Sequence, residues 1–321
     1  MIHARIRTSD GNIRVDPPTE ELHRLLEDQG NVSWVDLESP TADELGLIAG
    51  ILGWSHLTVE DLTRQGQRAK LEQFEHYSCL VMHILTYEGD PPRLETVEAD
   101  FVIGRNYVAS VHYVPIAHMT ESREVTEHTD SLLGNGADYL LYVLTDQLVD
   151  SYFPVLDQML EAVEDLENRI LAHPANTLMP RIFEMKRDAV VLRKVMSPQL
   201  EVFSRLTTPA YGIVGVAHVF YFRDVHDHLI RVFESTDSYR ELMSGALDAY
   251  LSTVSNRMTD VMKRLALVAT IFLPMTFMTG LIGMNLREIP PWHDNLFWVL
   301  LGAMGTLSVG QWLYFVRRGW V

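Results

Sequence analysis

The chain has 321 residues and a formal net charge of −17, from 26 basic and 43 acidic side chains. Nucleic-acid binding needs clustered lysine and arginine, so this acidic balance argues against a nucleic-acid partner. It is compatible with a protein that handles cations, although most acidic proteins are merely soluble. Cys79 is the single cysteine, which excludes a disulfide framework and a cysteine-based metal site. Its place in an apolar run predicts a buried thiol.

The N-terminal third reads as a mixture of strands and short helices. Met1–Val15 contains no apolar core of the kind found in signal peptides, so we expect the large N-terminal part to be cytoplasmic. Thr41 and Glu44 form a capping-box pattern that predicts a helix through Leu52, and a second short helix is expected at 58–63. Strands are expected from the β-type runs that follow turn signals, at 13–15, 32–37, 70–74, 79–87, 94–103 and 107–113. The segment 104–106 is expected to turn the last two strands into a hairpin. The pattern predicts a sheet with helices packed on it.

Strand signals stop near Glu121, and long amphipathic helices follow. Apolar residues at helical spacing predict one helix over 138–172 and a second over 177–206, together an antiparallel hairpin. A third helix is expected to begin near residue 217, with an apolar face that includes Leu242, and to run on without a break toward residue 285. We therefore expect a cytoplasmic α/β domain at 1–215, a stalk helix at 216–264 and a membrane domain at 265–321.

Two uncharged apolar segments, 265–284 and 296–316, dominate the C-terminal end. Each has about the 20 residues needed to cross the hydrocarbon of a bilayer as a helix. Basic pairs lie at 263–264 and 317–318, whereas the loop at 285–295 has one arginine, which predicts that both termini are cytoplasmic and the loop is external. The alternative is a helical hairpin buried in the core of a soluble protein.

Small, polar and apolar residues form one stripe along the first span. Two helices cannot enclose a polar path, so the spans are either an anchor or one part of an assembly of several copies. Such a stripe suits a helix-packing seam and suits the lining of a narrow channel, and spacing alone does not separate the two. Its members are Met262, Leu265, Ala269, Leu273, Thr276, Gly280 and Gly283.

The tripeptide Gly283-Met284-Asn285, at the end of the first of two C-terminal spans, resembles the signature of the CorA family of magnesium and cobalt channels. The resemblance covers most of the chain from about residue 55. It implies a homopentamer in the cytoplasmic membrane, with an α/β/α sandwich as the α+β cytoplasmic domain, a long stalk helix and two C-terminal transmembrane helices. Further similar segments are 138–142 with Asp146 and Asp150, 221–225, 262–263 and 269–274.

The resemblance also implies roles for individual residues. Gly283, Met284 and Asn285 would form the selectivity filter, with a ring of Asn285 amides facing a hydrated ion. Mg²⁺ keeps its waters, and the amide oxygens can accept hydrogen bonds from these waters without holding the ion too tightly. The other residues that would line the pore are Thr259, Met262, Leu265, Leu273, Thr276 and Gly280. The family usually has asparagine at the position of Thr259. This sequence therefore departs from the family pattern at the polar ring of the pore that lies furthest from the filter.

Regulation by intracellular Mg²⁺ is the last role that the resemblance implies. Carboxylates facing each other across subunit interfaces would bind the ion; the matching positions are Glu88, where aspartate is more usual, and Asp224. Bound Mg²⁺ would hold the ring symmetric and closed, whereas repulsion between bare carboxylates would loosen it. The alternative interpretation is that Glu88 and Asp224 are ordinary solvated carboxylates without a regulatory role. Mg²⁺ is thus expected as transported and regulatory ion, with Co²⁺ as a second transported ion.

Two other functions remain open from the sequence. A zinc transporter of the same architecture is suggested by His218, His226 and His228, but the last two lie two residues apart and so face different sides of a helix. A non-transporting, membrane-anchored sensor could use the same stalk and hairpin. An enzyme is the least favoured, because the chain has no phosphate-binding glycine loop, nucleophile elbow or His-Glu metalloprotease motif.

Overall fold

The computed structural model describes residues 1–128, 132–208, 211–283 and 293–320. Residue contacts divide the chain into two units. The first consists of Met1–Asn168 with Ala175–Ala246, and the second of Arg169–Pro174 with Leu247–Val321. The boundary between them at residue 246 falls inside one helix, α8 (Val219–Gly283), which therefore contributes residues to both units.

The first unit is built on a seven-stranded sheet of order β2-β1-β3-β7-β6-β5-β4. All neighbouring strands are antiparallel except β3 and β7, which are parallel. The predicted hairpin at 104–106 is present between β6 and β7, and a Cβ at Gly104 would lie 2.1 Å from the Tyr107 ring, so this turn requires glycine. The strands are β1 (Ile2–Arg7), β2 (Ile13–Val15), β3 (Val32–Glu38), β4 (Lys70–Gln73), β5 (Tyr77–Gly89), β6 (Pro92–Gly104) and β7 (Tyr107–His112).

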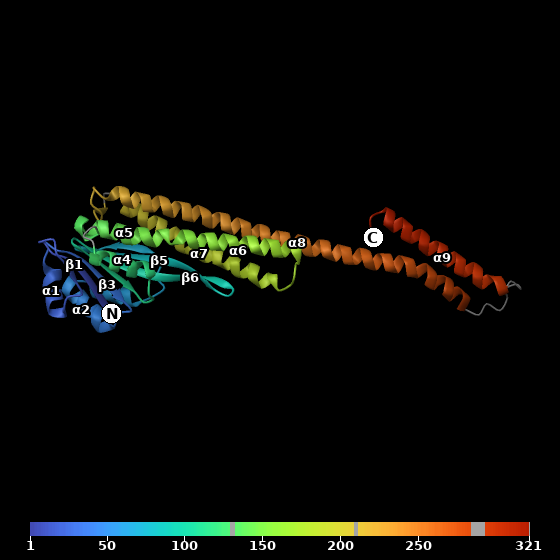
Figure 1. The fold of residues 1–321 in the computed structure, drawn as a ribbon, viewed down its shortest axis with the longest axis horizontal. Coiled ribbons are helices and arrows are strands. Elements are labelled where there is room, and N and C mark those ends of the chain that lie inside the picture. The colour runs from blue at the N-terminus through green and yellow to red at the C-terminus, as the bar shows by residue number, and fades with distance from the viewer. Residues whose placement is uncertain (129–131, 209–210, 284–292, 321) are drawn as a thin grey trace. The chain divides into compact units, whose positions relative to one another are not determined.

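Helices cover both faces of this sheet, which confirms the predicted α/β/α sandwich (Figure 1). Three short helices pack on one face: α1 (Thr19–Glu27), α2 (Ala42–Leu52) and α3 (His56–Thr63). The other face is contacted by α4, α5 and α7. The helices of that side are α4 (Ala117–His128), α5 (Ala137–Asp150), α6 (Tyr152–Ala172), α7 (Leu178–Leu206) and the first part of α8.

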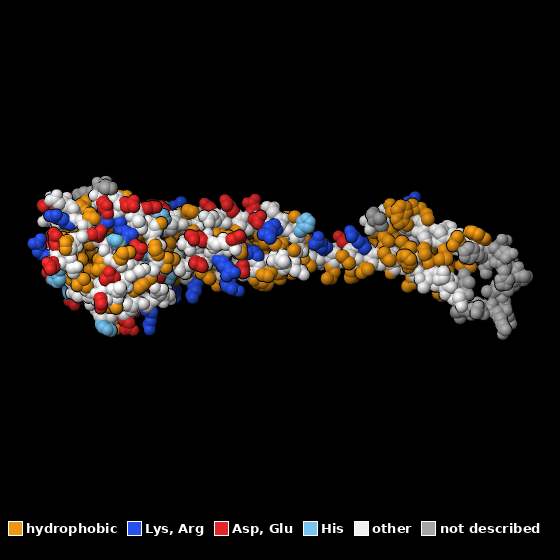
Figure 2. Space-filling view, turned by 60° about the horizontal axis from the view of Figure 1, so that its bottom comes forward, with side chains coloured by type: hydrophobic (Ala, Val, Ile, Leu, Met, Phe, Trp, Pro, Cys, Tyr) orange, Lys and Arg blue, Asp and Glu red, His pale blue; other side chains and the backbone are white. Residues whose placement is uncertain are grey.

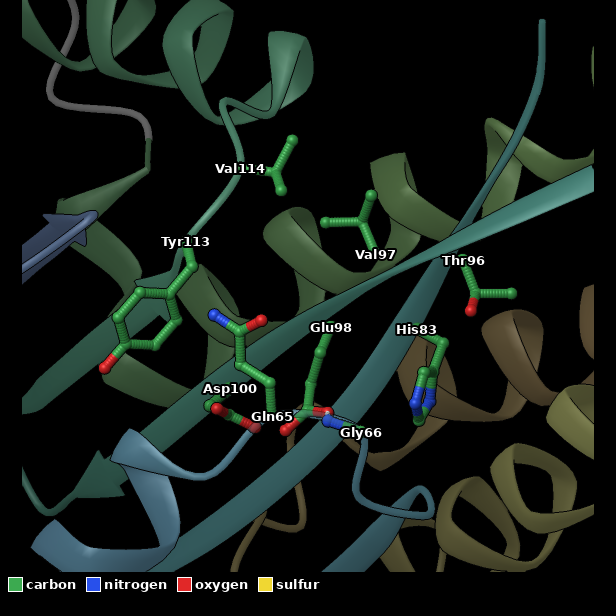
Figure 3. Close-up of a pocket in the computed structure, with 9 residues that line it drawn as sticks. All are labelled: Gln65, Gly66, His83, Thr96, Val97, Glu98, Asp100, Tyr113 and Val114. Carbon is green, nitrogen blue, oxygen red and sulfur yellow. Dashed lines mark hydrogen bonds between the residues drawn. The ribbon is translucent and has the colours of Figure 1, made fainter.

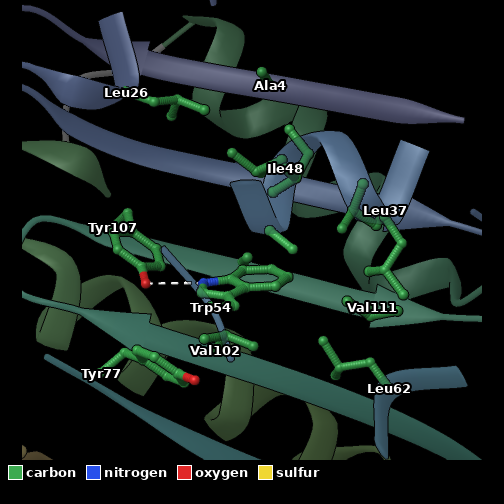
Figure 4. Close-up of a cluster of buried hydrophobic side chains, with 14 of the residues drawn as sticks. Ala4, Leu26, Leu37, Ile48, Trp54, Leu62, Tyr77, Val102, Tyr107 and Val111 are labelled. Carbon is green, nitrogen blue, oxygen red and sulfur yellow. Dashed lines mark hydrogen bonds between the residues drawn. The ribbon is translucent and has the colours of Figure 1, made fainter. Parts of the chain in front are cut away.

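The apolar core between the sheet and α1–α3 follows from strand alternation. In β3, Val35 and Leu37 point into this core, whereas Trp34 and Asp36 face the opposite helix layer. Figure 4 shows the core with Trp54, whose indole Nε1 donates a hydrogen bond to the Tyr107 hydroxyl at 3.0 Å. Burying a side chain of this kind stabilises the fold by roughly 1.5–3 kcal/mol. Cys79 is buried in the same core, as predicted.

The predicted capping box is present at the start of α2. Thr41 Oγ1 accepts a hydrogen bond from the Glu44 backbone N–H at 3.2 Å, and Glu44 Oε2 accepts one from the Thr41 N–H at 2.9 Å. The pair satisfies two N–H groups that have no partner inside the helix. Gly53 ends α2 with φ of 70°, a left-handed conformation that favours glycine.

Two details of the long helices differ from the sequence-based prediction. The expected single helix over 138–172 is two helices, α5 and α6, separated at Ser151. Pro154 has no N–H to donate to the Asp150 carbonyl, so the helical hydrogen-bond pattern is interrupted there. Leu242, predicted on the apolar face of α8, is 42% exposed. The face that is buried instead repeats at three- and four-residue intervals, through Phe222, Val225, Leu229, Val232, Thr236, Tyr239, Met243 and Ala246.

Candidate functional site

The end of α8 and the helix α9 (His293–Arg317) carry the two apolar segments. Val219–Leu281 and Trp298–Arg317 each contain a stretch apolar and long enough to cross a bilayer. No residue of the α8 stretch is buried, and 6% of the α9 stretch is, so the described chain does not enclose them as a soluble core would. Figure 2 shows hydrophobic side chains gathered over α9. These properties are compatible with insertion into a membrane.

The residues predicted to line a pore lie along one stripe of α8. They follow one another at intervals of three or four residues, with one step of eight between Leu265 and Leu273, and such spacing keeps them on one side of a helix. Every one of them is exposed within the described chain, with the Leu265 and Leu273 side chains 65% and 71% exposed. The whole set is Thr259, Met262, Leu265, Leu273, Thr276, Gly280 and Gly283.

Hydroxyl groups on the stripe are oriented by the helix itself. Thr276 Oγ1 donates to the Phe272 carbonyl at 2.9 Å, and Thr259 Oγ1 donates to the Ser255 carbonyl at 3.0 Å. With its hydrogen used in this way, each oxygen presents lone pairs outward, which suits it to accept hydrogen bonds from water. Met284 and Asn285 of the tripeptide lie outside the described residues, as does most of the segment 285–295 that is predicted as a loop.

Asp224 belongs to a cluster of acidic residues and one histidine in the first unit. Asp146, Asp150 and His228 each place a potential metal-ligand atom within 4.8 Å of the others. His228 Nδ1 lies 3.1 Å from Asp150 Oδ1, and its Nε2 lies 3.8 Å from Asp224 Oδ2. One oxygen of Asp146 is buried without a hydrogen-bond partner among the described residues. Three carboxylates and an imidazole suit a divalent cation.

Burial raises the pKa of Asp146, and the nearby Asp150 carboxylate raises it further, while His228 acts in the opposite direction. The positive charge that the protein supplies in this cluster therefore does not offset the burial of Asp146 and its repulsion by Asp150. Sequence reasoning singled out Asp224 but missed Asp146, Asp150 and His228 as partners. The available signal was the i, i+4 spacing within each pair, Asp146 with Asp150 and Asp224 with His228, which places both members on one face of a helix.

Glu88, the other predicted sensor residue, lies near the end of β5 and is exposed. Its register partner in β6 is Arg93. Within the described chain, Glu88 makes no hydrogen bond or ion pair and does not join the Asp224 cluster. A shared site of Glu88 and Asp224 would therefore need two copies of the chain.

A second group with metal-ligand spacing, Asp36, Glu38 and His112, is neutralised by protein instead. Arg123 lies 3.1 Å from a carboxylate oxygen of Asp36 and 3.1 Å from one of Glu38. His112 Nε2 lies 3.2 Å from Asp36 Oδ1, to which the Ser110 hydroxyl also donates at 2.6 Å. The guanidinium occupies the place that a cation would take, so this network stabilises the packing of α4 against the sheet.

The three histidines that suggested zinc are dispersed. His218 pairs with Asp138 at 2.9 Å, His226 approaches Asp227 at 3.9 Å, and only His228 joins the acidic cluster. The ligand groups in the described residues therefore do not include a pair of histidines.

Taken together, the α/β/α unit, the long helix α8 and the two exposed apolar segments are the features of a membrane protein with two C-terminal spans. The family model described as "CorA-like Mg2+ transporter protein" matches residues 29–318, and the chain belongs to this family. The family consists of transport proteins, not of enzymes.

Relatives of known name support the assignment over nearly the whole chain. The cobalt/magnesium transport protein CorA of Thermotoga maritima is 33% identical over 301 residues, covering 92% of this chain and 85% of that protein. The protein of the same name from Methanocaldococcus jannaschii is 23% identical over 328 residues and is covered in full, as is this chain. The solved structure of the complete CorA magnesium transporter from M. jannaschii matches with a TM-score of 0.84 at 20% identity, covering 100% of this chain and 99% of that one.

Proposed function

We propose that this protein is a channel for passive uptake of Mg²⁺, and of Co²⁺, across the cytoplasmic membrane, with both termini inside. It works as a homo-oligomer, a pentamer by the resemblance to its family. Intracellular Mg²⁺ bound between cytoplasmic domains closes it. The observation that carries this proposal is the stripe on α8, which is exposed in the described chain and which Met284 and Asn285 follow in the sequence.

Assembly of several copies turns this stripe into a pore lining. Met262, Leu265 and Leu273 then form apolar constrictions, which can close by losing their water. Thr276 and Thr259 supply rings of oxygen lone pairs between them, because their hydrogens are bonded to their own helix. The waters of a hydrated cation donate hydrogen bonds outward. Rings of oxygen lone pairs can accept these hydrogen bonds, so they suit the passage of such an ion.

The glycines near the outer end fit the same arrangement. A Cβ at Gly280 or at Gly283 would meet nothing within 4 Å, so packing inside the described chain does not require glycine at either position. Glycine costs a helix about 1 kcal/mol relative to alanine. Their use here is explained if neighbouring copies or a hydrated ion approach the backbone closely. Gly283, Met284 and Asn285 then form the filter, with the neutral Asn285 amide as its outermost ligand group.

Ion movement in this scheme needs no chemical energy source. An inside-negative potential stabilises entry by about 2.3 kcal/mol per elementary charge per 100 mV, and hence by about twice that for a divalent cation. The filter therefore has only to select and release the ion. Neutral amide groups suit this task, since a carboxylate ring would hold a divalent ion more tightly.

Closure is assigned to the Asp224 cluster together with Glu88 of a neighbouring subunit. Asp224 is exposed and lies 3.8 Å from His228, which in turn pairs with Asp150, so the site is open to an incoming carboxylate. Mg²⁺ prefers carboxylate oxygens and retained waters, which this surface supplies. Release of Mg²⁺ leaves the carboxylates unneutralised, and their repulsion across the interface loosens the ring.

The proposal is tested by ion influx into proteoliposomes that contain the purified protein under an inside-negative potential. Mg²⁺ influx that continues when Zn²⁺ is present outside in excess supports a channel for magnesium. Zn²⁺ influx without Mg²⁺ influx would assign the protein to zinc transport instead. Absence of flux of either ion, at low internal Mg²⁺, would leave a membrane-anchored sensor as the function.

A further inference from the structure

A cavity of about 370 Å³ lies beside strands β5 and β6, away from the Asp224 cluster. It is bounded by the loop that follows α3, at Gln65 and Gly66, and by the chain that follows β7, at Tyr113 and Val114. Figure 3 shows its lining, in which the Glu98 carboxylate lies between the side chains of His83 and Asp100. None of these three residues has a role in the pore or in the Asp224 cluster.

Sheet register brings the three polar side chains together. His83 on β5 is the direct partner of Glu98 on β6, and Asp100 follows two residues later on the same face of β6. His83 and Asp100 are only 8% and 4% exposed. The backbone of His83 is also held, because its N–H donates to Gln199 Oε1 at 3.2 Å and its carbonyl accepts a hydrogen bond from the Tyr152 hydroxyl.

Each of these side chains has a buried donor or acceptor atom without a partner. Glu98 Oε2 accepts hydrogen bonds from the backbone N–H groups of Gly66 and Gln67, at 2.6 and 2.8 Å, which fixes the carboxylate in place. Its other oxygen, Oε1, makes no hydrogen bond within the described residues, and neither do Asp100 Oδ1 and His83 Nδ1. Buried polar atoms are nearly always satisfied, so three such atoms around one cavity indicate that the cavity supplies their partner, as water or as a bound ion.

Within the described residues, no cation forms an ion pair with this group, although the charge of Lys70 favours the ionised form of Asp100. Lys70 is the cation on the neighbouring strand, and its ammonium already lies 2.6 Å from Asp61 and 3.1 Å from Glu72. Among the ion pairs between described residues, none includes Glu98 or Asp100. Burying a carboxylate without a counter-charge is costly, and a bound cation would remove that cost.

We propose that His83, Glu98 and Asp100 form a second metal site, which takes a divalent transition-metal ion such as Co²⁺, Ni²⁺ or Zn²⁺ in preference to Mg²⁺. The donor atoms would be His83 Nδ1, Glu98 Oε1 and Asp100 Oδ1. An imidazole nitrogen suits these ions, whereas Mg²⁺ favours oxygen ligands alone. This site is separate from the proposed channel function and stands or falls independently of it.

The cavity leaves space for water molecules as the remaining ligands of the ion. The three donor atoms do not meet the 4.8 Å mutual separation found for the Asp146 and Asp36 groups, so the ion is expected to be bound with water molecules and with rotation of the His83 ring. The cavity, at about 370 Å³, is large enough for several water molecules. The loop at 64–67, which Glu98 anchors, is the element whose position such an ion would stabilise.

Calorimetric titration of the full-length protein with Co²⁺, in detergent and in excess Mg²⁺, tests the site. Mg²⁺ occupies the oxygen-only sites, and a His228→Gln background removes the imidazole of the Asp224 cluster. We expect His83→Gln and Asp100→Asn each to bind one Co²⁺ fewer per chain than this background. His76→Gln, which changes an exposed histidine in the turn before β5, is the matched control and should bind as the background does.

Thermal unfolding measured without metal separates loss of the site from loss of the fold. Burial raises the pKa of Asp100 to about 8, so at neutral pH without metal Asp100→Asn replaces a mostly uncharged acid by an amide of similar size and should unfold at about the same temperature as the background. The variant should lose the extra stabilisation by Co²⁺. Unchanged Co²⁺ stoichiometry and affinity in both His83→Gln and Asp100→Asn would overturn the proposal. So would equal displacement of the ion by Mg²⁺, since the site would then lack nitrogen coordination.

Discussion

His228 Nδ1 on α8 lies 3.1 Å from Asp150 Oδ1 on α5. The same imidazole places Nε2 3.8 Å from Asp224 Oδ2, one helical turn earlier on α8. A single ring therefore links two carboxylates that come from two different helices. This arrangement makes the surface around Asp224 a preformed group of ligands, and it leads to predictions about how the channel closes.

Replacing Asp224 by asparagine removes one charge from the proposed Mg²⁺ sensor. We expect Asp224→Asn to need roughly tenfold more internal Mg²⁺ for half-maximal closure, which corresponds to about 1.4 kcal/mol of binding free energy. Flux from proteoliposomes loaded with graded Mg²⁺ measures this. Asp227→Asn, an exposed acid on the same helix, should close as the wild type does. An unchanged Mg²⁺ dependence in Asp224→Asn would show that the cluster does not regulate flux.

His228 should matter more for closure by Co²⁺ than for closure by Mg²⁺. The imidazole nitrogen is a good ligand for Co²⁺ and a poor one for Mg²⁺. In His228→Gln, the internal Co²⁺ concentration that closes the channel is therefore expected to rise several-fold while that of Mg²⁺ moves little. His226→Gln serves as the control on the neighbouring face of α8. Equal shifts for the two ions would contradict a ligand role for the ring.

Gly283→Ala distinguishes a glycine needed by the assembled pore from one needed by the helix. Nothing lies within 4 Å of the added Cβ, and alanine stabilises a helix by about 1 kcal/mol relative to glycine, so the variant should fold. Mg²⁺ flux is nevertheless expected to fall by roughly tenfold or more, because the added methyl group obstructs the filter. Gly302→Ala on α9, where a Cβ also meets nothing, should retain flux. Equal flux in the two variants would remove Gly283 from the pore.

His112 predicts a pH dependence of stability. Burial lowers the pKa of His112, but the hydrogen bond to Asp36 and the charge of Asp36 outweigh burial and leave the pKa raised above its ordinary value. The folded protein thus binds the proton more tightly than the unfolded chain does. The resulting stabilisation is complete below the ordinary histidine pKa, about 6.5, and is lost as the pH rises through the raised value.

Comparing the unfolding temperatures of the wild type and His112→Gln at several pH values measures this loss of stabilisation. The wild type should exceed the variant by more at pH 6 than at pH 9, because glutamine does not titrate. His76→Gln, which replaces an exposed ring outside the Asp36 network, is the matched control. A gap between wild type and His112→Gln that widens with rising pH would reverse the sign and contradict the account.

Local signals in the sequence were sufficient for several elements. The capping box at Thr41 and the turn at Gly104 act within a few residues, and both were predicted. The two apolar spans and the α8 stripe were also readable, since length and helical period determine them. Strand β1 and helices α1 and α4 were missed. The polar residues of β1, such as Arg5, weaken its strand pattern, although Arg5 is buried through pairing with Asp16 and Glu127.

Features that depend on long-range register could not be read in the same way. The pairing of His83 with Glu98 follows from the alignment of β5 with β6, and the meeting of Asp150 with His228 follows from the packing of α5 beside α8. Neither relationship has a local sequence signal. The break between α5 and α6 is different, because Pro154 was visible and its effect on the Asp150 carbonyl was overlooked.

The central claim is that Asn285 selects the transported ion, and Mg²⁺ influx into proteoliposomes carrying wild-type protein or Asn285→Ala tests it most directly. Asn295→Ala, which alters an amide at the other end of the same predicted loop, is the matched control. We predict Mg²⁺ influx in the wild type and in Asn295→Ala, and its collapse or loss of selectivity in Asn285→Ala. Influx of the same rate and selectivity in Asn285→Ala would contradict the account.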